Sequence, residues 1–161
     1  MLSLRVNVKV VELAKVLVVC DSVYGNTEKV AKALASGMET AGVEVDLAKV
    51  ADVDFGRLGE YDLLAVGAPT QAFGVYKSVQ EFLERLKSAN LKGKKGFAFD
   101  TKLKSRLAGS AAKGIEGRLK DLGLTVVKPR ASAIVKGREG PLEEGAEETF
   151  KQIGAELAKM M

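Results

Sequence analysis

Apolar positions along the chain follow two spacings, which predict strands and helices in alternation. Short and almost entirely apolar runs occur at residues 15–20, 63–68 and 96–99 and, as a broken pair, at 124–127 and 131–135. Such runs are typical of strands that are covered on both faces. Residues 43–50 alternate more strictly between apolar and polar side chains, which indicates a strand nearer the edge of a sheet.

Between these runs the apolar side chains recur every three or four residues, as in helices that bury one face. Four stripes of this kind are formed by Val30, Leu34, Met38 and Ala41; by Val79, Phe82, Leu83 and Leu86; by Ala112, Ile115, Leu119 and Leu122; and by Ala146, Phe150, Ile153 and Leu157. Gly42 and Gly123 follow the first and third stripes, where we expect those helices to end.

The order of these elements predicts an α/β fold. Right-handed crossovers would place the strands in a five-stranded parallel sheet with helices on both faces. Pro129 interrupts the last strand, which suits the edge of a sheet. We expect residues 15–161 to form a single domain. Residues 1–14 precede it as an extension whose apolar positions alternate, and this segment could add an edge strand or take no part in the fold.

The amino-acid composition argues against several kinds of catalytic and metal site. The chain has 161 residues, of which 47% are apolar and 29% charged, as expected for one folded domain. Cys20 is the only cysteine and histidine is absent, so we predict no internal disulfide, no metal site and no catalytic side chain of the Ser-His or Cys-His kind. No apolar run is long enough to span a membrane and the start does not resemble a secretory signal, so we expect a cytoplasmic protein without a membrane partner.

Charge is distributed unevenly. Residues 77–138 carry 16 basic and 5 acidic side chains, whereas the segments before and after have net charges of −3 and −4. A basic segment of this size could attract an anionic ligand, an acidic protein or nucleic acid. The interpretation that we favour is a lysine-rich solvated surface, and we do not expect nucleic acid as the partner.

Candidate chemistry lies in the turns, because ligands of doubly wound sheets bind beyond the carboxyl ends of the strands. The turn DSVYGNTE at 21–28 leads a predicted strand directly into a helix, where backbone N–H groups and the positive end of the helix suit an anion. Ser22, Asn26 and Thr27 add donors, and Gly25 permits close approach or a positive φ angle. The turn lacks the lysine of nucleotide triphosphatase loops and the GxGxxG of dinucleotide-binding loops. Alternatively, Asn26 or Thr27 only caps the helix.

These residues resemble those of a known family. The turn is similar to the flavodoxin phosphate loop T/S-x-T-G-x-T at Ser22, Gly25, Asn26 and Thr27, with Tyr24 in the place of the middle threonine as in flavodoxin-like quinone reductases. The stretch GEYDLLAVGAPTQAFG at 59–74 resembles the family's Y-D motif and the flavin-side loop that follows it. GRLKDLG at 117–123 precedes the last strand, as in the family. The resemblance covers residues 15–161 and is closest to short-chain flavodoxins.

The resemblance implies a three-layer sandwich of strand order 2-1-3-4-5 that binds flavin mononucleotide (FMN). Its phosphate would be held by Ser22, Val23, Tyr24, Gly25, Asn26 and Thr27. The flavin ring would lie between the loops at 68–76 and 100–109, with contacts from Pro69, Thr70, Gln71, Ala72, Phe73, Gly74, Asp100, Thr101 and Lys102. Phe73 or Tyr76 could stack on the ring, or both could pack against the neighbouring helix.

Residues 100–110 depart from the family pattern. They contain no aromatic side chain to cover the ring and carry three basic residues, Lys102, Lys104 and Arg106, where electron-carrying flavodoxins have acidic ones. A cation about 6.5 Å from the ring would stabilise negative charge by roughly 2.5 kcal/mol at a dielectric constant near 20, or about 100 mV for one electron. We therefore predict a less reducing flavin than in those carriers, unless these side chains point into water.

The function that this implies is electron transfer by bound FMN, because the flavin carries the chemistry and the chain supplies binding and charge. The partner would be a redox protein, which could be acidic, and the chain could be a monomer or a homodimer. One alternative is an NAD(P)H-dependent quinone or flavin reductase of the same fold. Another is a flavin-free module that binds an anionic partner. Cys20 fits a buried core thiol better than a redox group.

Overall fold

A computed structural model describes residues 13–71 and 74–161. Residues 1–12, Ala72 and Phe73 lie outside the described part of the chain, and with them most of the predicted extension and two of the predicted flavin contacts. No helix of the described part combines the length and the apolar character needed to cross a membrane.

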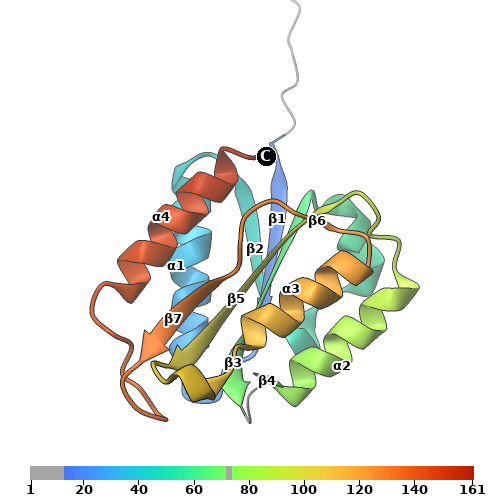
Figure 1. The fold of residues 1–161 in the computed structure, drawn as a ribbon. Helices are drawn as coiled ribbons and strands as arrows, with labels where there is room; N and C mark the ends of the chain where they lie inside the picture. Colours follow the sequence, from blue (N-terminus) through green and yellow to red (C-terminus); the bar gives the residue numbers. More distant parts are fainter. Residues whose placement is uncertain (1–12, 72–73) are drawn as a thin grey trace, which may run out of the picture.

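The strands form one sheet with the path β2-β1-β3-β5-β6 (Figure 1). The strands are β1 (Lys15–Cys20), β2 (Glu44–Lys49), β3 (Leu63–Gln71), β4 (Gly74–Val75), β5 (Lys95–Leu103), β6 (Thr125–Val126) and β7 (Ala131–Val135). Both β6 and β7 pair in parallel with β5, one after the other along its length. They are the two halves of the strand that Pro129 was expected to interrupt. Counted as one, they give the predicted order 2-1-3-4-5, which is confirmed.

The number of strands differs from the prediction of five. β4 pairs antiparallel with the end of β3, through Thr70 with Val75 and Gln71 with Gly74. This two-residue strand is too short to show an alternation in the sequence. In addition, β3 and β5 extend beyond their apolar runs, since the ladder continues through the pairs Ala68–Asp100 and Pro69–Thr101. Polar side chains in these extensions concealed them from the hydrophobic pattern.

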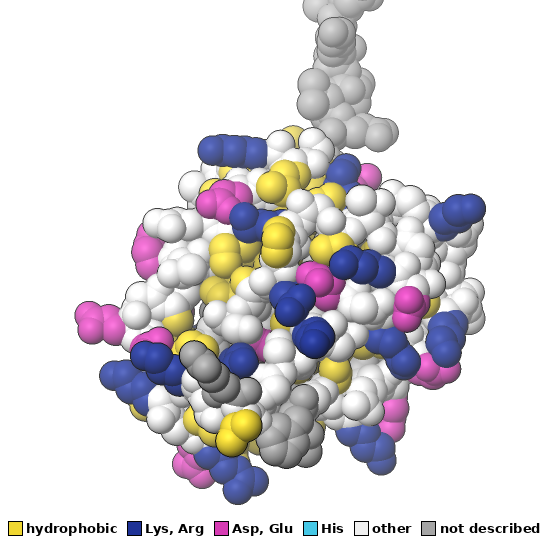
Figure 2. Space-filling view, viewed as in Figure 1, with side chains coloured by type: hydrophobic (Ala, Val, Ile, Leu, Met, Phe, Trp, Pro, Cys, Tyr) yellow, Lys and Arg dark blue, Asp and Glu magenta, His cyan; other side chains and the backbone are white. Residues whose placement is uncertain are grey.

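Within residues 13–71 and 74–161, four α-helices cover the sheet in pairs: α1 (Asn26–Thr40), α2 (Lys77–Arg85), α3 (Ala111–Asp121) and α4 (Ala146–Ala158). α1 and α4 lie on one face, and α2 and α3 on the other (Figure 1). The predicted stripes face the sheet, although Ala41 lies beyond the end of α1 and is exposed. The outer surfaces of α2 and α3 carry charged side chains of both signs (Figure 2). Short 3-10 turns occupy Val50–Asp52, Phe55–Glu60, Leu86–Ser88 and Arg106–Ala108.

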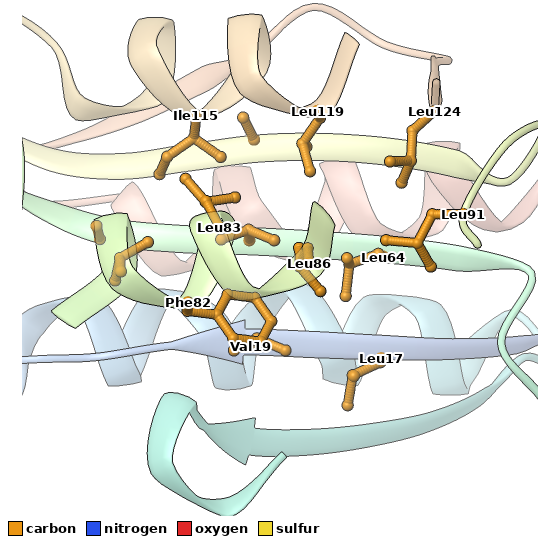
Figure 3. Packing of buried hydrophobic residues seen from close by; sticks show 14 of the residues in the cluster. Leu17, Val19, Leu64, Phe82, Leu83, Leu86, Leu91, Ile115, Leu119 and Leu124 are labelled. Atoms are coloured by element: carbon orange, nitrogen blue, oxygen red, sulfur yellow. The ribbon is translucent and has the colours of Figure 1, made fainter. Parts of the chain in front are cut away.

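Alternate residues of the central strands feed two separate cores. Leu17 and Leu64 point to the face covered by α2 and α3, where they meet Phe82 and Ile115 among others (Figure 3). Their sequence neighbours Val16 and Leu63 point to the face of α1 and α4, with Leu34, Met38 and Phe150. The central strands are therefore buried on both faces, which explains why their sequences are continuously apolar.

Close contact between α1 and α4 depends on two glycines. A Cβ atom on Gly37 would lie 2.0 Å from the backbone oxygen of Lys151, and one on Gly154 would lie 2.2 Å from that of Leu34. Neither position leaves room for a methyl group, because the obstacle is backbone. The two helices therefore touch along their backbones at this crossing.

We expect Gly154→Ala to lower the free energy of unfolding by about 1–3 kcal/mol, because the added methyl must push the helices apart. Gly117→Ala is the matched control: Gly117 lies in α3 with open space around its Cβ position, so alanine should stabilise the helix by up to about 1 kcal/mol. Urea unfolding of both variants measures the difference. Equal effects of the two substitutions would contradict this packing.

Candidate functional site

A pocket of about 470 Å³ opens at the carboxyl edge of the sheet, a volume within the usual range of small-molecule sites. It lies between the turn after β1, the ends of β3 and β5, and the loop after β7. Its lining residues are Ser22, Val23, Tyr24, Asn26, Thr27, Pro69, Thr70, Gln71, Thr101, Lys102, Leu103, Val135 and Arg138. The three loops chosen from the sequence thus meet at one place.

The turn before α1 is built on the backbone conformation of Gly25. Its φ angle is +87°, and an added Cβ would meet nothing within 4 Å, so glycine is needed for the positive φ and not for space. Gly25 is also the N-cap residue of α1, and no described side chain caps this helix. The interpretation of Asn26 or Thr27 as simple capping residues is therefore wrong.

Asn26 and Thr27 instead hold distant segments against the turn. Thr27 is buried, and its hydroxyl shares a hydrogen bond of 2.8 Å with that of Thr101 at the end of β5. Asn26 Nδ2 donates to the backbone oxygen of Glu139, at 3.1 Å, in the loop after β7. Both side chains thereby fix the walls of the pocket around the start of α1.

Unpaired donors collect at the same place. The first bond of α1 runs from Lys29 N to Gly25 O, so the N–H groups of residues 26–28 have no partner within the helix. Ser22 Oγ is buried and has no hydrogen-bond partner among the described residues. A buried hydroxyl left without a partner costs free energy, and Ser22 lines the pocket. This donor set fits the phosphate group of a mononucleotide.

Asp100 lies beneath the pocket and does not line it. It is fully buried, and its Oδ2 accepts hydrogen bonds from Thr70 Oγ1 (3.1 Å), Ser110 Oγ (2.9 Å) and the backbone N–H of Ala112 (2.9 Å). The carboxylate therefore holds a backbone N–H and two hydroxyls in place. Asp100 joins the ends of β3 and β5 to the start of α3 and so supports two of the pocket's loops.

The second loop contributes Pro69, Thr70 and Gln71 to the pocket. Gly74 lies in β4 and does not line it. Tyr76 is partly buried against the core under α2 and α3, and it borders a smaller hollow beside Cys20. Packing, the alternative to stacking on the ring, therefore holds for Tyr76.

The third loop presents aliphatic groups in place of an aromatic one. Leu103 lines the pocket and is 43% exposed, and Leu107 is 79% exposed, a large apolar exposure for a leucine. Lys102 lines the pocket, whereas Lys104 lies outside it and pairs with Glu143 at 3.9 Å. The described lining carries two cations, Lys102 and Arg138, and no carboxylate. Dark-blue side chains gather over the ends of β5 and β7, at the lower left of Figure 2.

Cys20 ends β1 next to the turn and is buried. Burial raises the pKa of its thiol to about 12, and the nearby carboxylate of Asp21 adds to the shift. The thiol is therefore protonated at neutral pH and lacks the thiolate that redox chemistry needs. The prediction of a core thiol is confirmed.

The family model described as Flavodoxin matches residues 18–153, which include the turn at 21–28, the loops at 68–76 and 100–109, and the last strand. The chain belongs to the flavodoxin family. A protein named flavodoxin from Maridesulfovibrio salexigens is 34% identical over 91 residues, 54% of this chain and 62% of that protein. A protein named NAD(P)H dehydrogenase (quinone) from Sinorhizobium fredii is 32% identical over 102 residues, 51% of each chain. The matched segments thus span less than two thirds of these relatives.

Solved structures agree with the family. A flavodoxin from the domain Archaea superposes with a TM-score of 0.81 at 28% identity, over 91% of this chain and 97% of that one. The parallel sheet with helices on both faces is therefore the flavodoxin fold, as the sequence resemblance implied.

Sequence reasoning missed three lining residues of this flavodoxin-family pocket: Leu103, Val135 and Arg138. Leu103 belongs to the extension of β5 that the apolar pattern did not reveal. Val135 and Arg138 lie at and after the carboxyl end of β7, so the strand-end rule that selected the other three loops applies to them too. The end of the last predicted strand therefore marks this fourth loop in the sequence as well.

The role of Asp100 can be tested by stability. Asp100→Ala would leave two hydroxyls and one buried N–H without their acceptor, so we expect the free energy of unfolding to fall by about 2–4 kcal/mol. The control, Asp121→Ala, removes an exposed carboxylate at the end of α3 and should change it by less than about 0.5 kcal/mol. Similar urea midpoints for the two variants would show that Asp100 does not organise these loops.

Proposed function

We propose that this protein binds FMN in the pocket and carries electrons between redox partners. The observation that carries the proposal is the buried hydroxyl of Ser22, which has no partner among the described residues and lies beside the unpaired N–H groups of α1. Ser22, Asn26 and Thr27 would hold the phosphate. The segments 69–71 and 101–103 would hold the flavin ring.

FMN, when bound, supplies reversible electron transfer. The chain's part is to bind, to exclude water and to set the local charge. Leu103 and Leu107 offer the apolar surface that residues 100–110 otherwise lack. Lys102 and Arg138 place positive charge on the lining, which supports the prediction of a less reducing flavin.

A second function is favoured by two observations. The relative from Sinorhizobium fredii is named as a quinone-reducing NAD(P)H dehydrogenase, and Tyr24 lines the pocket while remaining 45% exposed. The same site would then take a nicotinamide cofactor and a quinone in turn. Steady oxidation of NADH by the purified protein with a quinone would select this function over that of a carrier.

We further propose that the carrier's redox partner is a protein with an acidic surface. Lys104 and Leu107, which follow the end of β5, and Lys136, which follows the end of β7, are all exposed. Opposite charges across an interface speed association more than they add affinity. The rate of reduction by such a partner should therefore fall as salt rises, and a rate that does not depend on salt would exclude this partner.

Binding is the first test of the proposed function. We expect the purified protein to be yellow and its apoprotein to bind FMN saturably, which quenching of flavin fluorescence measures. Ser22→Ala should weaken binding by about tenfold or more, because a hydrogen bond to a charged group is lost. The apoprotein of this variant should be as stable as wild type or more so, since a buried group without a partner is gone.

Ser36→Ala, which does not line the pocket, is the control and should leave FMN affinity unchanged. A colourless protein without saturable FMN binding would refute both the carrier and the quinone reductase. In that case the remaining alternative is a flavin-free module that binds an anionic partner.

The charge of the pocket predicts the flavin's potential. Lys102→Gln removes a half-buried cation from the lining, so the reduced, anionic flavin should be less stabilised. We expect the reduction potential to fall by about 30–60 mV, less than the unscreened estimate because the site is partly open to water. Lys104→Gln, outside the lining, should change it by less than about 15 mV, or a factor of two on a one-electron scale. Spectroelectrochemical titration measures both, and equal shifts would contradict a local effect of Lys102.

A further inference from the structure

Two residues of the loop between β7 and α4 hold this loop against the turn at residues 21–28. The backbone oxygen of Glu139 accepts the hydrogen bond from Asn26 Nδ2. Gly140 packs so closely on the same side chain that an added Cβ would lie 2.8 Å from Nδ2. The loop is also closed on itself, through Lys136 N to Pro141 O at 2.9 Å and Gly140 N to Gly137 O at 3.0 Å. Its tip is thus held next to the start of α1.

Arg138 is the charged side chain that this loop adds to the pocket lining. No carboxylate of the described residues lies within ion-pair distance of its guanidinium, whereas Lys104, outside the pocket lining, is paired with Glu143. The positive charge of Arg138 is therefore available to a ligand in the pocket.

The turn itself has the opposite charge balance. It contains Asp21 and Glu28 and no basic residue. Ser78 donates a hydrogen bond to Asp21, and Lys32 pairs with Glu28 at 3.3 Å. A phosphate monoester carries a charge of about −1.5 to −2 at neutral pH, so the N–H groups and hydroxyls of the turn would have to hold it without a cation of their own.

We propose that Arg138 supplies this missing cation and recognises the phosphate group of the bound mononucleotide. The inference rests on the proposed function and adds a residue from a fourth loop to the phosphate site. The planar guanidinium can donate two parallel hydrogen bonds to phosphate oxygens. It follows that Arg138 discriminates FMN from riboflavin, which has the same ring and lacks the phosphate.

Paired titrations test this. In Arg138→Gln, we expect the dissociation constant of FMN to rise about tenfold or more, as for a lost hydrogen bond to a charged group, while that of riboflavin stays within about twofold. Arg138→Lys keeps the positive charge but loses the two parallel donors of the guanidinium. Its dissociation constant for FMN should therefore lie between those of the wild-type protein and Arg138→Gln. Lys136→Gln is the matched control, because it removes one exposed charge from the same loop outside the lining. It should leave both affinities unchanged.

Inorganic phosphate gives a second measurement that does not need the ring. It should compete with FMN for the wild-type protein and compete markedly less for Arg138→Gln. Equal loss of FMN and riboflavin affinity in Arg138→Gln would assign the arginine to the ring or to the fold and overturn the inference. Equal losses of FMN affinity in Arg138→Gln and Lys136→Gln would mean that only the net charge of the loop matters, which would also overturn the inference.

The two proposals fail separately. If the wild-type apoprotein binds neither flavin, the proposed function falls and this inference falls with it. If wild type binds FMN and Arg138→Gln binds it equally well, only the role of Arg138 is refuted. The unfolding midpoint of each apoprotein shows that the variants are folded, as expected for an exposed side chain at a loop tip.

Discussion

The parallel register of β1, β3, β5 and β7 determines where the loops after these strands, and with them the pocket, lie. Cys20 pairs with Gly67, Gly67 with Phe99, and Phe99 with Ala131, so four strands reach one level of the sheet together. A Cβ on Gly67 would lie 2.1 Å from the ring of Phe99, which shows how closely this level is packed. Because parallel strands end at a common edge, the four loops that follow them converge on one pocket.

Hydrogen bonds between those loops hold them in place around the pocket. Asp100 joins the ends of β3 and β5 to α3, Thr27 reaches Thr101, and Asn26 reaches Glu139. Buried polar groups in folded proteins almost always find such partners. Ser22 is the pocket-lining residue whose buried hydroxyl is left unpaired among the described residues.

In the folded chain, carboxylates lie beside many of the cations of the basic segment at 77–138. Many cations of the basic segment pair with carboxylates: Glu116 takes Arg130 and Lys120, and Glu84 takes Lys87 and Arg118. Glu143 and Glu156 of the acidic C-terminal segment take Lys104 and Lys128. Apart from those of Glu116, which is buried, these pairs are largely exposed and contribute little stability, so they support the interpretation of much of the segment as solvated surface. Lys102 and Arg138, which line the pocket, form no ion pair among the described residues.

The sequence alone was enough for the order of strands and helices, the helix ends at Gly42 and Gly123, and the turn at 21–28, because each depends on spacings and turn chemistry within a few residues. It could not reveal the polar extensions of β3 and β5, the supporting role of Asp100, or the place of Tyr76 in the core. Arg138 lines the pocket next to Glu139, whose backbone oxygen accepts a hydrogen bond from Asn26 across 113 positions of sequence. Contacts over such separations are made by the packing of the whole sheet, so only the tertiary structure could decide which distant side chains share the site.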